Sequence, residues 1–377
     1  MSVNNRAPAR GAPTVGFNVQ LVGRKVIVPF FISHQGCPHH CVFCDQRRIS
    51  GSGGALPSPV EIQEKVRQFR EISDQASVEV AFYGGSFTML PLHEQRRLLA
   101  PLQPMLDAGE VSAIRLSTRP DALAPDIIGL LREFRISLVE LGVQSMDDSV
   151  LTASGRGHTA TDTLSAFDLL QRDGIAVGGQ LMPGLPGDSP ATALRSLRDL
   201  LALKPACLRI YPTVVVEGTE LAQRYRLGEY VPLSLTDAVS LGARMLHAAL
   251  RADVPVIRMG LQATDTLAGP DGVVAGPWHP AFRHLVASEL AYDLLLQLAD
   301  DWTGPVAVTA HPSRLSAIIG QNSANRNRLR ERGILLQKVH PDAGLSPHDL
   351  VVTMAGTTRK GNIVTDLHYP DLEACHV

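Results

Sequence analysis

Three of the chain's five cysteines lie close together, and their spacing limits the fold and the chemistry more than any other feature of the sequence. Cys37, Cys41 and Cys44 form a C-x3-C-x2-C pattern. Thiolates are the ligands that iron–sulfur clusters take, and three of them can hold a cubane cluster with one iron left open for a substrate or cofactor. The pattern therefore predicts a [4Fe-4S] cluster bound by these three cysteines.

A structural zinc site is the alternative, with His34, His39 or His40 as the fourth ligand of a tetrahedron. No second ligand pair follows at the distance typical of zinc fingers, so iron is favoured. Only Cys207 and Cys375 lie outside the cluster of cysteines. This usage argues against a disulfide framework and indicates a reducing compartment.

Composition limits the classes of protein that the chain can belong to. With 377 residues and 45% hydrophobic residues, it can form one large domain and a smaller one. A net charge of −2 makes no overall case for binding nucleic acid or a membrane surface. The N-terminus has no apolar signal-peptide core, and no apolar run approaches the ~20 residues that span a bilayer. We expect a cytoplasmic protein with no membrane contact.

Short apolar runs alternate with amphipathic helical patterns over most of the chain. The expected strands are 25–33, 78–83, 111–117, 137–142, 175–182 and 207–213, with helices such as 60–72, 92–106, 161–172 and 191–202 between them. Successive βα units imply a parallel sheet with right-handed crossovers. The sequence thus predicts an α/β protein with a partial (β/α)6 TIM-type barrel, whose functional groups lie at the carboxyl ends of the strands.

The expected organisation has three parts. Residues 1–23 are small, polar and rich in proline, and we expect them to be flexible. Residues 24–268 form the barrel domain. A Gly-Pro-Asp-Gly turn at 269–272 begins a small α/β C-terminal domain, residues 269–377.

Motifs at the expected strand ends carry a family resemblance. The cysteine pattern, with aromatic Phe43 before its last cysteine, resembles the signature of the radical SAM superfamily. Each later motif is by itself an ordinary turn. Together these motifs are similar, in order and spacing, to the radical SAM domain of the Elongator protein 3 family over about residues 25–250. The motifs are residues 83–88, 117–121, 140–145, 155–159, 182–187, 209–221 and 228–230.

The resemblance implies that S-adenosylmethionine chelates the open iron and is cleaved reductively to methionine and a 5′-deoxyadenosyl radical. It also implies an electron donor of the flavodoxin or ferredoxin type. Ser86 stands where the family has the acid of a "GGE"-type motif, and Arg156 is expected to pair with the cofactor's carboxylate. The cofactor-binding residues implied are Phe43, Gly84, Gly85, Ser86, Ser117, Gln144, Ser145, Arg156, Gln180 and Tyr211.

Three departures separate the chain from Elongator-type proteins. Its first two cysteines are closer together, no acetyltransferase domain is recognisable, and the strand expected after the barrel, at 256–262, lacks their arginine-rich sequence. The chain thus resembles a shorter relative. Coproporphyrinogen oxidase-like radical SAM enzymes share the compact cysteine spacing but match the later motifs less well.

The C-terminal region is similar in its order of elements to a KH module. Expected elements are a strand at 305–309, helices at 313–319 and 324–332, and a strand at 334–339. A KH module clamps a nucleic-acid backbone with a Gly-x-x-Gly loop, whereas residues 320–323 here lack the second glycine. Residues 311–340 contain six Arg or Lys and one Glu, which indicates either an RNA contact or an ordinary solvated helix.

These observations predict a radical SAM enzyme, and the basic stretch with the Elongator likeness favours RNA as its substrate. A small-molecule substrate is the first alternative. A non-enzymatic iron–sulfur carrier or redox sensor is the second, and an RNA-binding protein with a vestigial barrel is the third.

Overall fold

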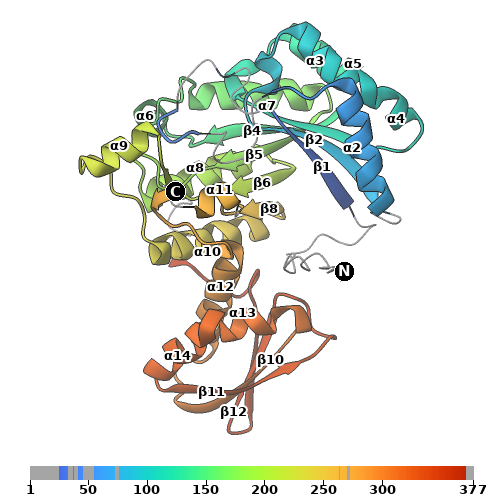
Figure 1. Cartoon of the computed structure of the whole chain (residues 1–377). Helices are drawn as coiled ribbons and strands as arrows, with labels where there is room; N and C mark the ends of the chain where they lie inside the picture. The colour runs from blue at the N-terminus through green and yellow to red at the C-terminus, as the bar shows by residue number, and fades with distance from the viewer. Residues whose placement is uncertain are drawn as a thin grey trace, which may run out of the picture.

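The computed structural model describes residues 25–32, 37, 41–45, 55–72, 76–262, 264–269 and 272–370. The expected flexible segment 1–23 lies outside these residues. Two sheets form the two lobes seen in Figure 1, a large curved sheet above and a smaller one below.

The large sheet has seven parallel strands in chain order, and it confirms the partial barrel. They are β1 (Lys25–Phe31), β2 (Ser77–Tyr83), β3 (Ala113–Thr118), β4 (Ile136–Gln144), β5 (Ala176–Leu181), β6 (Cys207–Ile210) and β8 (Val256–Met259). The strand that was expected after the barrel, at 256–262, is part of the barrel. It forms the seventh strand of the sheet, because β8 pairs in parallel with β6. The expected strand at 207–213 is shorter, and ends at Ile210.

Helices cover the outer side of the curved sheet (Figure 1). They are α2 (Pro59–Ile72), α3 (Leu92–Leu99), α4 (Gln103–Asp107), α5 (Pro125–Glu133), α7 (Ala160–Arg172), α8 (Pro190–Ala202) and α10 (Leu235–Arg251). Alternate strand residues such as Val80, Leu116 and Val139 are buried in the core that these helices complete. Because side chains alternate between the faces of a strand, the residues between them line the inner, concave face.

Polar side chains occupy this concave face in neighbouring strands. Glu79, Arg115, Glu140 and Arg209 take such alternate positions in β2, β3, β4 and β6. Gly178, at the equivalent level of β5, has no side chain, and a Cβ there would lie 2.8 Å from Cys207 Sγ and 3.4 Å from Glu140 Cγ. The barrel interior is thus a polar surface, and the apolar core lies outside the sheet.

The small sheet contains four strands in the order β11-β10-β12-β13. Their bounds are β10 (Gly304–Ala310), β11 (Ile334–Pro341), β12 (Asp349–Met354) and β13 (Thr357–Asn362), with α13 (Leu315–Ile319) and α14 (Ala324–Glu331) between the first two. The expected strand–helix–helix–strand order from 305 to 339 is confirmed. Helix α12 (Phe282–Leu298) joins the lobes, since it packs on α10 of the barrel and on α13, β12 and β13.

Short elements complete the described chain. They are α6 (Asp148–Ala153), β7 (Val215–Val216), α9 (Glu220–Arg226), α11 (Asp265–Ala268) and β9 (Val273–Ala275), and β7 and β9 pair antiparallel. In the part of the chain that the structure describes, no helix has both the length and the apolar character needed to cross a membrane.

The close approach at Gly178 gives a first prediction. Gly178→Ala should lower the free energy of unfolding by about 1–3 kcal/mol, because the new methyl group meets Cys207 Sγ. Adding Cys207→Ala should recover part of this loss, and the coupling is measured by a double-mutant cycle of urea denaturation. Gly129→Ala is the control, because its Cβ would meet nothing within 4 Å and it lies inside a helix. Additive effects of the two substitutions would contradict the contact.

Candidate functional site

The cysteine loop is held by a small core of its own, separate from the main one. Val42 and Phe43 are buried there with residues from α6, β7 and α9. Val42 N–H donates to Ser154 O at 3.1 Å, and Leu221 N–H donates to Val42 O at 2.8 Å. Phe43, expected in the cofactor pocket, therefore lies among apolar side chains that fix the loop to α6 and α9.

The thiol of Cys44 lies close enough to the other two cysteines for them to affect its ionisation. Burial, together with the neighbouring Cys41 and Cys37 thiols, raises the pKa of Cys44 to about 12. Among the described residues, no three His, Cys, Asp or Glu side chains converge on a single metal ion. The histidines of the zinc alternative, His34, His39 and His40, lie outside the described residues.

Arg156 connects the cysteine loop to the edge of the sheet. Its Nη1 donates to Cys41 Sγ at 3.4 Å, and its Nη2 donates to Gly142 O at 2.5 Å. The side chain is 7% exposed, and its Nε is buried without a hydrogen-bond partner in the described part of the chain. A buried, unsatisfied N–H is costly, so this guanidinium has a donor to offer an anionic group beside the thiols.

The turn after β2 brings a second element to the same loop. Gly84 and Gly85 have φ values of +70° and +63°, which L side chains rarely adopt. The turn places Ser86, whose side chain is fully buried, with its Oγ 3.5 Å from Cys37 Sγ. The Gly84–Ser86 turn after β2 and Arg156 after α6 thus both approach the cysteine loop at the carboxyl edge of the sheet.

Two glutamines meet at the ends of β4 and β5. Gln180 Nε2 donates to Gln144 Oε1 at 3.1 Å, and Gln144 itself has a φ of +69°. Such a conformation in a residue other than glycine is strained, and strain of this kind occurs at functional sites. Ser117 lies half-buried on β3 one strand away.

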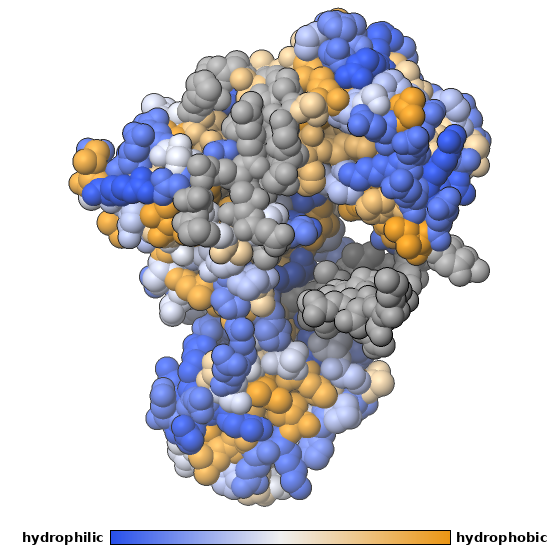
Figure 2. Space-filling model, viewed as in Figure 1, coloured by the Kyte–Doolittle hydropathy of each residue, from blue (hydrophilic) through white to orange (hydrophobic). Residues whose placement is uncertain are grey.

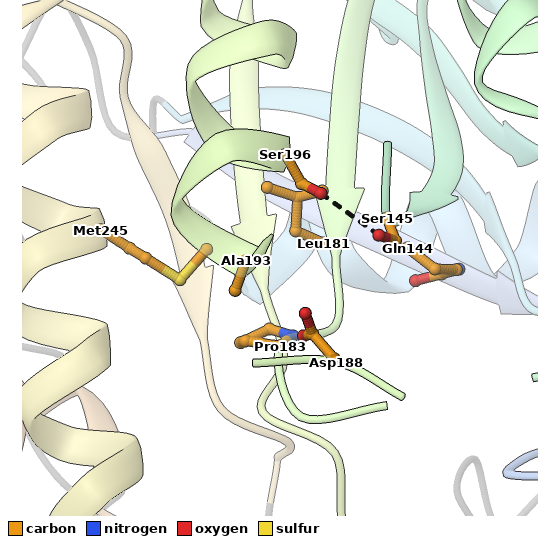
Figure 3. A pocket seen from close by; sticks show the side chains of 8 residues that line it. All are labelled: Gln144, Ser145, Leu181, Pro183, Asp188, Ala193, Ser196 and Met245. Carbon is orange, nitrogen blue, oxygen red and sulfur yellow. Dashed lines mark hydrogen bonds between the residues drawn. The ribbon is translucent and has the colours of Figure 1, made fainter. Parts of the chain in front are cut away.

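Ser145 does not join this group. Its hydroxyl lies 3.2 Å from Ser196 Oγ on α8 and accepts from Asp147 N–H (Figure 3). Figure 3 shows Ser145 and Ser196 among the side chains that line a crevice between the strand ends and α8. Ser145 thus connects the end of β4 to α8.

A buried charge network, which the sequence analysis did not predict, crosses the concave face. Glu140 accepts from Arg115 Nη2 at 2.7 Å and from Arg209 Nε, and Arg115 Nη1 also donates to Glu79 at 3.3 Å. Lys25 on β1 donates to Glu79 at 2.9 Å. Arg209 then donates to the hydroxyls of Tyr83 and Tyr211. Single charged residues inside apolar strand runs were the available signal for this network.

The carboxylate of Glu140 is ionised in this environment. Its burial alone would raise the pKa, but the attraction of Arg209 and Arg115 outweighs that effect, and the pKa of Glu140 lies below its usual range. Tyr211, Glu140 and Tyr83 hold the pKa of Arg209 well above its ordinary value, against the effect of burial. The concave face is therefore charged over the whole neutral pH range.

The basic stretch of the C-terminal lobe is only partly available to a ligand. Arg314 is 4% exposed and donates to Pro347 O. Arg328 pairs with Glu289 and stacks on the Tyr292 ring at 3.6 Å. The exposed cations are Arg326, Arg330, Arg332 and Lys338, on or beside α14 and on β11, and hydrophilic residues gather over the α14 side of this lobe in Figure 2.

Comparisons with known proteins agree with this architecture. The family model of the radical SAM superfamily matches residues 31–200, and that of the radical SAM C-terminal domain matches residues 205–292. Together they cover more than half of the chain. The chain therefore belongs to the radical SAM superfamily, a class of enzymes.

Individual relatives include proteins of the Elongator type. An uncharacterized protein of Methanocaldococcus jannaschii is 30% identical over 217 residues, covering 55% of this chain and 66% of the relative. A tRNA uridine(34) acetyltransferase of the same organism is 25% identical over 263 residues, covering 59% of this chain and 49% of the relative. The solved structure of archaeal Elp3 from Methanocaldococcus infernus matches with a TM-score of 0.56 at 22% identity, over 71% of this chain and 63% of that one, and shares the fold. The chain spans about half to two thirds of the length of these curated relatives.

The charge network gives a prediction about stability and pH. Glu140→Gln should lower the free energy of unfolding at about pH 7 by about 3–5 kcal/mol, because it leaves buried guanidinium groups without their carboxylate. The pKa of Glu140 is lowered in the fold, so its contribution is present above the ordinary value of 4.5 and is lost as pH falls through the lowered pKa. The difference in free energy of unfolding between the wild-type protein and Glu140→Gln should therefore become smaller as the pH falls below 4.5 and through the lowered pKa.

Urea denaturation from neutral to acidic pH measures this effect. The control is Glu133→Gln, which removes an exposed carboxylate paired with exposed Arg96 and should change stability little. A Glu140→Gln deficit no larger than that of the control would contradict the importance of the network.

Proposed function

We propose that this protein holds a [4Fe-4S] cluster at Cys37, Cys41 and Cys44, binds S-adenosylmethionine beside it, and modifies an RNA substrate. The observation that carries the proposal is the meeting of the cysteine loop with Arg156 and the Gly84–Ser86 turn at the carboxyl edge of the half-barrel. Held by Cys37, Cys41 and Cys44, the cluster would supply one electron for the cleavage of S-adenosylmethionine to methionine and a 5′-deoxyadenosyl radical. The electron would come from a donor of the flavodoxin or ferredoxin type, in the cytoplasm.

The residues around the cysteine loop fit this cofactor pair. The unpaired Arg156 Nε is a charge-assisted donor for a carboxylate, which S-adenosylmethionine carries. Gly84 and Gly85 have no side chains, so the backbone of this turn can approach a ligand closely, and the Ser86 hydroxyl can donate or accept. Gln144 and Gln180 place side-chain amide groups at the next two strand ends, where a nucleoside can be hydrogen-bonded.

Two features support RNA as the substrate. Relatives that match over half of the chain are named tRNA uridine(34) acetyltransferase. The exposed cations Arg326, Arg330, Arg332 and Lys338 give the C-terminal lobe a surface suited to phosphates. The C-terminal lobe would then bring RNA to the barrel. A small-molecule substrate is the second candidate, and it is favoured by the polar side chains of the concave face.

The cluster and its chemistry give the third prediction. Anaerobically reconstituted protein should contain about four irons per chain and, with a strong reductant, release 5′-deoxyadenosine from S-adenosylmethionine. Cys37→Ala, Cys41→Ala and Cys44→Ala should each abolish both. The control is Cys207→Ala, because Cys207 is buried in the sheet and far from the loop in sequence. Stoichiometric zinc in place of iron, or loss of iron in the Cys207 variant, would contradict the assignment.

The exposed cations of α14 give the fourth prediction. Replacing Arg326 and Arg330 together by Gln should flatten the salt dependence of RNA binding by roughly 0.7 log unit per lost phosphate contact per decade of salt, because fewer counterions are released. Fluorescence anisotropy of a labelled tRNA at several salt concentrations measures the slope.

Replacing Arg132 and Arg172 by Gln is the matched control, because it removes two exposed charges from the barrel helices. An equal change of slope in the two double variants would show diffuse attraction and not a docking surface. Absence of RNA binding at low salt would reject RNA and leave the small-molecule substrate.

A further inference from the structure

Two tyrosine hydroxyls are held side by side by one guanidinium on the concave face. Arg209 Nη2 donates to Tyr83 OH at 2.8 Å, and Arg209 Nη1 donates to Tyr211 OH at 3.0 Å. A guanidinium only donates hydrogen bonds, so both phenol oxygens are acceptors here and each keeps its own hydrogen for another partner. Within the residues that the structure describes, neither hydroxyl donates to a protein acceptor.

The guanidinium that fixes the pair is itself immobilised. Arg209 Nε donates to Glu140 Oε2, its Nη2 donates to Glu140 Oε1 at 3.2 Å, and its Cζ lies 4.7 Å from the centre of the Tyr83 ring. Arg115 holds Glu140 from the other side, with both Nε and Nη2 on Oε1. The two O–H groups are therefore donors arranged before any ligand arrives, which lowers the entropic cost of binding.

The position of the pair suits a ligand inside the barrel. Tyr83 is the last residue of β2 and precedes the Gly84–Ser86 turn, and Tyr211 follows the end of β6. Both side chains are half-buried, so solvent and ligands reach them. Burial and the nearby Glu140 carboxylate raise the pKa of Tyr83 to about 12, so its hydroxyl stays a donor at neutral pH.

The charge around the pair selects the kind of acceptor. The connected network contains three cations, Lys25, Arg115 and Arg209, against two carboxylates, Glu79 and Glu140. The excess positive charge favours an anionic oxygen over a neutral carbonyl, since hydrogen bonds to charged acceptors are about twice as strong as neutral ones.

We propose that Tyr83 and Tyr211 bind an anionic oxygen of the substrate, carried by a carboxylate or a phosphate. This inference rests on the proposed function in placing a substrate at the concave face. It adds the chemical group by which the substrate is held there, and it makes the two tyrosines a specificity-determining pair.

Fluorine NMR of the full-length chain labelled with 3-fluorotyrosine tests the pair directly. The chain has six tyrosines, and Tyr83→Phe and Tyr211→Phe assign the two resonances. Titration with acetate or inorganic phosphate at constant ionic strength should move both resonances together and to saturation. Whichever anion binds more tightly identifies the substrate group as a carboxylate or a phosphate.

Controls in the same spectra separate binding from general effects. The resonances of exposed Tyr225 and of Tyr369, whose hydroxyl donates to Asp293, should not move. In each Phe variant the dissociation constant of the anion should rise by about tenfold or more, because one hydrogen bond to a charged acceptor is lost. Unmoved Tyr83 and Tyr211 resonances, or equal shifts with neutral acetamide, would overturn the inference.

The same samples distinguish this inference from the proposed function. If iron and S-adenosylmethionine fail to bind while the pair takes up anions, the proposed function is wrong and the anion site stands. If the cluster forms and S-adenosylmethionine is cleaved while no anion reaches the pair, the function stands and the inference is wrong.

Discussion

The contact of Glu140 with Arg115 and Arg209 is the interaction on which the rest of the concave face depends. It links β3, β4 and β6 across the inside of the sheet, where Glu140 is only 4% exposed. Buried ion pairs contribute little net stability, because desolvation offsets their attraction, but losing one partner is costly. The network therefore fixes the side chains of the inner surface. Glu140 holds Arg209 in one orientation, and Arg209 in turn positions the hydroxyls of Tyr83 and Tyr211.

The carboxyl edge of the sheet depends on a different constraint. Parallel strands end at one edge, so the cysteine loop after β1, the glycine turn after β2 and the Gln144 backbone after β4 are brought close together without being close in sequence. The loop is then fixed by its own small core, in which Phe43 packs between α6 and α9 residues. The cysteine loop and the polar groups of the concave face thus rest on separate supports, one apolar and one charged.

Local sequence patterns were sufficient to predict much of the fold. The alternation of strands and helices predicted the sheet and the order of elements from 305 to 339, and the C-x3-C-x2-C spacing indicated the radical SAM superfamily. Pairing between distant strands was not predictable, because no local pattern shows that Val256–Met259 pairs with β6 or that Glu140 meets arginines from two other strands. The basic composition of residues 311–340 was evident from the sequence, but only the fold shows that Arg328 pairs with Glu289 and that Arg314 is buried.

The central claim is that three cysteines leave one iron open and that S-adenosylmethionine binds to it. Pulsed electron paramagnetic resonance of the reduced, reconstituted protein tests it most directly, with S-adenosylmethionine carrying nitrogen-15 at its amino group. The account predicts a change in the cluster spectrum on addition of the cofactor and a hyperfine coupling to that nitrogen. An unchanged spectrum with no nitrogen coupling, from protein that contains its full iron, would contradict it.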